Sequence, residues 1–206
     1  MKRILRGKVT EIEKLLLMNY DQCTNYLKTK YGNVPKDYFV NERCTQNSRG
    51  NTRTNEGLYL HHIDEDKAIL LSTTEWAIKN PFDYQRADRL VYCNLLEHLV
   101  LHIKIFEFPN PNKNIIDDVG VGGIYAFIAP ELNDIYSGIK YKRQWKQKIT
   151  NVVLPLKDDY FKCIKKLVDL NFPYPLLTSF NERFGLWNNE KNQLLYDELK
   201  QIGVKK

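Results

Sequence analysis

The stretch YLHHIDEDKAILLS, residues 59–72, places two adjacent histidines on a segment that alternates as a β-strand does, and an acidic turn follows them. We predict a β-hairpin over residues 57–72, with LYLHHI as the first strand, DEDK as the turn and AILLS as the returning strand. Neighbouring residues on a strand point to opposite faces, so His61 and His62 are expected to play different parts.

The other two histidines of the chain, His98 and His102, lie in the apolar segment EHLVLHIK, residues 97–104, which predicts a buried helix. A spacing of four on a helix brings both imidazoles to one face, where they can hold one metal ion. Either histidine pair alone is more often a set of hydrogen-bonded core residues than a metal site. All four histidines of the chain lie in these two short segments, and together they favour a metal site.

The segment GLYLHHIDED, residues 57–66, followed by an H-x-x-x-H helix, resembles the HNH (ββα-metal) nuclease superfamily and is most similar to its colicin-type branch. The resemblance covers residues 57–105. It implies a metal-dependent endonuclease that hydrolyses DNA phosphodiester bonds, with His62 as the general base and His61, His98 and His102 as ligands of one divalent ion. A compact nuclease of this kind fits a bacterial or phage setting, in restriction, defence or mobile elements.

The chain departs from the family pattern at the central asparagine, which ties down the loop that carries the histidine pair. Its usual distance before the last histidines falls near Asp88 or Arg89. Asn94 is our candidate for the catalytic site, although its position equally allows a metal-side residue or a helix N-cap. Asn80 is a further candidate.

The expected cofactor is one divalent metal ion. Three imidazole ligands favour Zn²⁺, Ni²⁺ or Co²⁺ over Mg²⁺, which prefers oxygen ligands. Zinc could bind tightly while Mg²⁺ or Mn²⁺ supports turnover, so the sequence leaves the choice among Zn, Mg, Mn and Ni open.

The composition indicates a soluble globular protein with a basic surface. The 206 residues are 43% hydrophobic and 27% charged, and the net charge of +6 favours nucleic acid as a partner, DNA first and RNA second. Two segments carry the candidate nucleic-acid-binding residues, which are Arg43, Arg49 and Arg53 in the loop 40–57, and Lys142, Arg143, Trp145 and Lys146 in KYKRQWKQK, residues 140–148. The alternatives are a flexible polar loop and a solvated helix whose Trp145 packs inward.

The predicted fold class is α+β, mostly helical, with a ββα-metal hairpin-plus-helix core. We divide the chain into a helical lead-in and basic loop (1–56), the nuclease core (57–107) and a helical C-terminal part (114–206) that could bind DNA or form a homodimer. Two helices are expected in 8–31, with Asp21 as an N-cap and Gly32 as a stop, and further helices near 158–170 and 190–202. The break FPNPNKN, residues 108–114, separates the last two parts.

Other features predict a cytoplasmic protein. The four cysteines are far apart and are expected to be reduced, and neither a signal-peptide core nor a membrane span is visible. Asp64, Glu65 and Asp66 are interpreted as turn formers, because their charge would repel DNA. GVGG, residues 120–123, is only a weak phosphate-loop signal.

Two other functions fit the same sequence. One is a non-catalytic module in which the histidines hold a structural zinc and the basic surface binds nucleic acid or a protein. The other is a ribonuclease that uses the same site.

Overall fold

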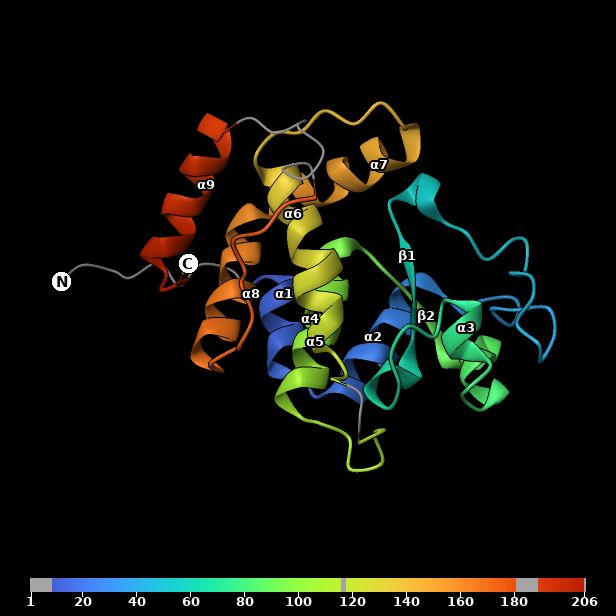
Figure 1. The fold of residues 1–206 in the computed structure, drawn as a ribbon. Helices are drawn as coiled ribbons and strands as arrows, with labels where there is room; N and C mark the ends of the chain where they lie inside the picture. The colour runs from blue at the N-terminus through green and yellow to red at the C-terminus, as the bar shows by residue number, and fades with distance from the viewer. Residues whose placement is uncertain (1–8, 116–117, 181–188, 206) are drawn as a thin grey trace.

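A computed structural model of the chain describes residues 9–115, 118–180 and 189–205. The fold is α+β and mostly helical, as predicted (Figure 1). The α-helices are α1 (Glu11–Leu17), α2 (Tyr20–Tyr31), α3 (Thr74–Ala77), α4 (Leu95–Glu107), α5 (Val121–Gly123), α6 (Ala129–Tyr136), α7 (Gln144–Val153), α8 (Lys157–Asp169) and α9 (Asn189–Gln201). The strands are β1 (Tyr59–His62) and β2 (Leu90–Cys93), and the shorter helical turns are η1 (Thr54–Glu56), η2 (Ile63–Asp66), η3 (Phe82–Gln85), η4 (Ala87–Arg89), η5 (Ile124–Ile128) and η6 (Leu154–Leu156).

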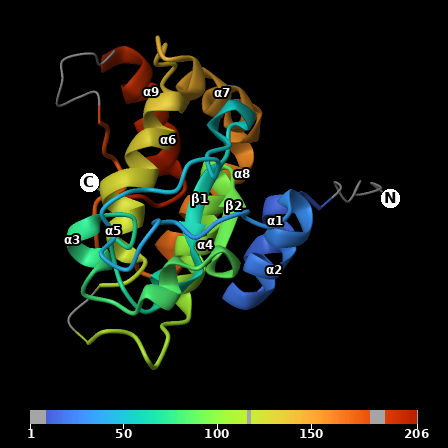
Figure 2. The same ribbon diagram turned by 90° about the vertical axis from the view of Figure 1, so that its right-hand side faces the viewer.

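Helix α4 forms the centre of the molecule. In Figure 2 it lies between α1 and α2 on one side and the α5–α6 segment on the other, and it contacts α1, α2, α8 and η5. Its residues Leu96, Leu99, Leu101 and Ile103 have no exposed surface. A helix that is apolar on nearly all sides is expected to be buried, and this one forms the packing support for the functional site.

The two-stranded sheet differs from the predicted hairpin. β1 pairs antiparallel with β2, in a register that places His61 opposite Val91 and His62 opposite Leu90. The predicted returning strand, AILLS, is irregular, and the acidic segment DEDK belongs to the helical turn η2 and the residue after it. The prediction was wrong because the residues VYC of β2 read as the start of the apolar helix that follows. The strand with which β2 pairs, β1, is separated from it by the 27 residues 63–89.

The start of α4 is fixed by a capping box. The Asn94 side-chain oxygen accepts hydrogen bonds from the backbone N–H groups of Leu96 and Glu97, both at 2.9 Å, and the Glu97 carboxylate accepts the Asn94 N–H at 2.7 Å. Glu97 also accepts hydrogen bonds from Lys30 and Tyr31 at the end of α2. These contacts set the rotation of α4 and therefore the direction in which its histidines point.

The helices near the two ends of the described chain agree with the predictions within a residue or two. The N-cap of α2 is Asn19 and not Asp21, and Gly32 ends the helix as expected. The predicted lead-in begins at residue 1, but residues 1–8 lie outside the described part. In the segment 140–148, the helix α7 starts only at Gln144.

One hydrophobic core joins residues from Ile12 to Val204 and includes the inner faces of α4, α6 and α8. All four cysteines are buried and unpaired, in agreement with the expectation of reduced thiols. Within the described ranges, no helix is both long and apolar enough to cross a membrane.

Candidate metal centre

Four side chains from three elements converge beside α4. They are His61 at the end of β1, Glu65 in η2, and His98 and His102 on α4. Each offers one nitrogen or oxygen atom, and these four atoms all lie within 4.8 Å of one another. The spatial convergence that the histidine spacing predicts is therefore present, with a carboxylate added to it.

The spacing within the cluster suits a small divalent ion. His102 Nε2 lies 3.2 Å from His98 Nε2 and 3.2 Å from Glu65 Oε2, and His61 Nδ1 lies 3.4 Å from the same Glu65 oxygen. Ligands at about 2.0–2.1 Å from a tetrahedral zinc ion are about 3.3 Å apart. In one tautomer His98 donates an N–H···N hydrogen bond to His102, whereas His61 Nδ1 and the Glu65 oxygen face each other without a hydrogen-bond partner between them, a contact that a cation would relieve. The donor set therefore fits a metal ion.

His61 is oriented by Tyr20 of α2. The Tyr20 hydroxyl donates to the backbone oxygen of Ile63 at 2.8 Å, and it accepts the Nε2–H of His61, also at 2.8 Å. Because Nε2 carries the hydrogen, Nδ1 has a free lone pair directed at the cluster. This Nδ1 is buried without a hydrogen-bond partner, and a metal ion is the kind of partner that such a lone pair can bind.

His102 is oriented by the glycine-rich segment 120–123. Its Nδ1–H donates to the backbone oxygen of Gly120 at 3.1 Å, which leaves Nε2 free for an ion. Gly120 has a φ of +79°, a conformation that glycine adopts at little cost. Gly123 lies against the imidazole so closely that a Cβ there would be 2.3 Å from His102 Cε1. The segment GVGG thus supports a metal ligand, and its weak resemblance to a phosphate loop has no counterpart in its contacts.

Glu65 is the site residue that the sequence interpretation missed. It does lie in a turn, as expected of the acidic run, but its side chain is only 18% exposed and points into the cluster. Burial would raise the pKa of Glu65, yet His61, His102 and His62 outweigh it and hold the pKa well below the usual range. Its position four residues after His61 is a signal that could have revealed it.

The other two acidic residues of the run have structural partners. Asp64 is buried and forms a two-pronged ion pair with Arg89, with both distances 2.7 Å. Asp66 accepts a hydrogen bond from Asn110. Both residues fasten η2 to neighbouring segments, so Glu65 is held in place from either side.

Burial favours the neutral form of two of the imidazoles, His61 and His98. Burial lowers the pKa of His61 to about 3, and although Glu65 partly opposes this, His102 and His62 add to it. Burial also lowers the pKa of His98 well below its ordinary value, with further lowering from His102 and His61. Neutral imidazoles are the form that binds metal ions, so the site is ready to accept one at neutral pH.

His62 lies on the other face of β1, next to the cluster but outside it. It has no exposed surface, and its ring packs on Tyr38 with the centroids 4.5 Å apart. Gln85 donates its amide hydrogen to the backbone oxygen of Leu71, so its side-chain oxygen must accept the Nε2–H of His62, at 3.0 Å. The neutral ring then carries its hydrogen on Nε2, and Nδ1, which has no hydrogen-bond partner, lies 3.6 Å from Glu65 Oε1.

The asparagine candidates do not reach the histidine pair. Asn94 caps α4 with its side-chain oxygen, and Asn80 donates to the backbone oxygen of Trp76 within its own turn. The contact that ties the histidine pair to the intervening segment is made by Gln85, and Arg89 adds the ion pair with Asp64. No pattern in the sequence marks Gln85, because its contact with His62 depends on the long-range path of 63–89.

Comparison with protein-family models, curated proteins and solved structures gives no significant match for this chain.

The candidate nucleic-acid-binding residues fall into two groups. Arg43, Arg49, Lys142 and Arg143 are exposed. The other three are engaged within the fold. Arg53 donates to Glu56 and to the Tyr31 backbone oxygen and stacks on Tyr92. Lys146 pairs with Glu131 and covers the ring of Trp145, which packs partly against the core.

Two pockets meet at the cluster. We call the first the polar pocket; it has a volume of about 370 Å³ and is lined mainly by the segment 47–60 with Tyr38, Glu65, Ser72 and His98. The second, the aromatic pocket, has a volume of about 540 Å³ and is lined by 68–73, 118–128 and Tyr174 together with Glu65, His98 and His102. Glu65 and His98 line both pockets and His102 lines the second, whereas His61 and His62 are fully buried and line neither.

Proposed function

We propose that the protein is a metal-dependent endonuclease of HNH type that hydrolyses phosphodiester bonds in DNA. The observation that carries the proposal is the convergence of His61, His98 and His102 on one point, with His62 directly beside it and its Nδ1 lone pair free. The order of β1, β2 and then α4 is the order of elements in a ββα core, although the segment 63–89 separates the two strands, and this order supports the proposal.

The metal ligands in this proposal are His61 Nδ1, Nε2 of His98 and of His102, and Glu65 Oε2 as a fourth donor. A divalent ion bound there would supply positive charge to offset the charge that grows on the phosphate and on the leaving oxygen during hydrolysis. Three nitrogen ligands favour zinc, nickel or cobalt over magnesium.

His62 is proposed to take the proton from the attacking water. Gln85 fixes its tautomer, so that the nitrogen nearer the cluster is the one able to accept a proton. Glu65 Oε1 lies 3.6 Å from this nitrogen and would stabilise the imidazolium that forms. The packing of Tyr38 on the imidazole keeps the ring from turning.

The basic character of the chain supports a polyanionic substrate. The chain carries a net charge of +6, and Arg43, Arg49, Lys142 and Arg143 are exposed basic residues that could contact phosphates. RNA cleavage at the same site is the next alternative, because the cluster chemistry does not depend on the sugar.

A structural zinc site is favoured by one observation. Four protein ligands can close a tetrahedral zinc site, which would leave no position for a substrate. Against this, the cluster is lined by two pockets, whereas a structural site needs no access.

The test combines metal analysis with cleavage assays on plasmid DNA, single-stranded circular DNA and RNA across Zn²⁺, Ni²⁺, Mn²⁺ and Mg²⁺. His62→Asn should retain the metal and stay folded, with a lower unfolding temperature because the buried ring contacts are lost, while turnover falls about 100-fold or more. His98→Asn, the matched variant within the cluster, should lose metal and activity together. Full activity in His62→Asn, or a metal-loaded protein that cuts no substrate, would refute the proposal and favour structural zinc.

A further inference from the structure

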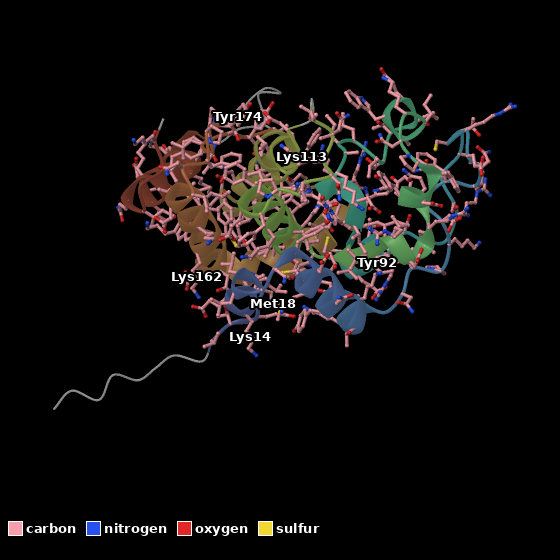
Figure 3. All side chains as sticks on the ribbon, turned by 90° about the horizontal axis from the view of Figure 1, so that it is seen from below. Lys14, Met18, Tyr92, Lys113, Lys162 and Tyr174 are labelled. Carbon is pink, nitrogen blue, oxygen red and sulfur yellow. The ribbon has the colours of Figure 1, made fainter. Side chains whose placement is uncertain are left out.

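The aromatic pocket has a composition unlike that of the rest of the surface. Among the described residues, the large exposed apolar side chains include four aromatic ones, and three of these, Tyr125, Phe127 and Tyr174, line this pocket. Tyr125 and Tyr174 stack with their ring centroids 4.6 Å apart and their planes 9° from parallel. Tyr174 lies on the side of the molecule away from Lys14 and Met18 (Figure 3). Exposed aromatic faces gathered in one hollow indicate a ligand with a flat apolar surface.

The backbone at the rim of the pocket is strained. Leu70 has a φ of +55° and its side chain is 36% exposed at the pocket wall. A bulky residue in the left-handed region costs free energy, and such residues concentrate at ligand sites. The fold thus keeps an apolar side chain exposed at a conformational cost, beside the metal cluster.

The pocket is not suited to phosphate groups. None of the described residues that line it is lysine or arginine, and Asp118 at its rim carries a negative charge. On the other side of Glu65 and His98, the polar pocket offers the side chains of Asn47, Ser48 and Thr52. A ligand that passes the cluster would therefore place a polar part on one side and a flat apolar part on the other.

We infer that the aromatic pocket binds an unpaired nucleobase next to the scissile phosphate, so that the substrate is single-stranded nucleic acid. This inference rests on the proposed function. In this arrangement the phosphate lies at the cluster and its sugar faces the polar pocket. The base then lies among Tyr125, Phe127 and Tyr174, so each part of the nucleotide meets a surface of matching polarity. In a duplex the bases are stacked on one another, and a base could enter the pocket only after being flipped out. Asp118 can accept a hydrogen bond from an exocyclic amino group of the base.

The test uses the full chain loaded with its metal and a fluorescent 20-nucleotide DNA strand, offered alone, as a duplex, or with one abasic position. Wild-type protein should cut the single strand faster than the duplex and should avoid the bond next to the abasic position. Phe127→Ala should lower kcat/KM for the single strand about 5- to 150-fold, the factor expected for losing one stacking contact. Leu70→Gly should lower it as well without loss of stability, because glycine relieves the strained φ.

Phe108→Ala is the matched control, because Phe108 is 58% exposed but does not line the pocket. It should leave cleavage unchanged. Binding of the same strand to the metal-free protein, followed by fluorescence anisotropy, should weaken in Phe127→Ala and not in Phe108→Ala. Equal cleavage of single strand and duplex, or unchanged binding and cleavage in Phe127→Ala, would overturn this inference and leave the nuclease proposal intact. A metal-loaded protein that cuts no nucleic acid would overturn both.

Discussion

Gly123 lies in direct contact with the imidazole of His102, where a Cβ would come within 2.3 Å of Cε1 and 2.5 Å of Nδ1. A Cβ added at the preceding residue, Gly122, would have no neighbouring atom within 4 Å. We predict that Gly123→Ala displaces the His102 ring and lowers the metal affinity about 10- to 100-fold. Gly122→Ala should leave the affinity unchanged. Competitive metal titration with a chromogenic chelator measures both, and equal affinities for the two variants would contradict the prediction.

Removing the Tyr20 hydroxyl should affect metal binding from a distance. Tyr20→Phe leaves the Ile63 carbonyl and His61 Nε2 without their buried partner and frees the His61 tautomer. We expect about 1–3 kcal/mol of lost stability and metal affinity lowered about 10-fold. Tyr26→Phe on the same helix removes a hydroxyl that only contacts Glu11, and serves as the control. Urea denaturation measures the stability, and metal titration measures the affinity. Equal values for Tyr20→Phe and Tyr26→Phe would contradict this expectation.

Gln85 is predicted to act through His62. Gln85→Met removes the oxygen that accepts the Nε2–H of His62, so turnover should fall about 10-fold or more while the metal content stays the same. Gln85→Glu keeps an acceptor oxygen toward His62 but loses the donor to the Leu71 backbone oxygen, so it should restore part of the turnover at a cost in stability. Loss of metal in Gln85→Met, or no rescue by glutamate, would show that Gln85 only supports packing.

The two interpretations of Asn94 can be separated. If Asn94 acts only as an N-cap, Asn94→Ala should lower the free energy of unfolding by about 1 kcal/mol, within a range of about 0.5–2 kcal/mol. Asn94→Asp keeps the capping oxygen and should retain both stability and turnover. A large loss of turnover in a stable Asn94→Asp protein would instead indicate a catalytic role.

The metal-free protein is predicted to lose stability on mild acidification. The pKa values of His61, at about 3, and of His98 lie below the value of about 6.5 for an unfolded histidine. Between these values the unfolded chain binds more protons than the folded one, so the free energy of unfolding falls as pH decreases from about 6.5. Urea denaturation between about pH 7 and 5, above the range in which carboxylates titrate, measures this. Saturating Zn²⁺ should raise the stability throughout without reducing this slope, because an ion held by the imidazoles also keeps them unprotonated in the folded state. A pH-independent stability without metal would be the contrary result.

The sequence predicts those parts of the site that depend on local spacing. His98 and His102 share a helix face because they are four residues apart. Their convergence with His61 was expected because the His-His strand and the H-x-x-x-H helix together resemble a ββα-metal core. The strand pairing was mispredicted because β2 has no turn signal linking it to β1, and its apolar residues continue directly into α4. Glu65 and Gln85 were missed for a related reason, since each reaches its partner through the three-dimensional path of 63–89.

The candidate metal centre is supported by helices that are far apart in the sequence. A two-stranded ribbon of four residues per strand is marginal alone. It is held by α2 through Tyr20 and by α4, which in turn is packed by α1 and α8. A fragment limited to the strands and α4 would expose the apolar surface that these helices cover. The excised ββα unit is therefore expected to aggregate and not to fold, and transplanting this centre into another scaffold would require its flanking helices as well.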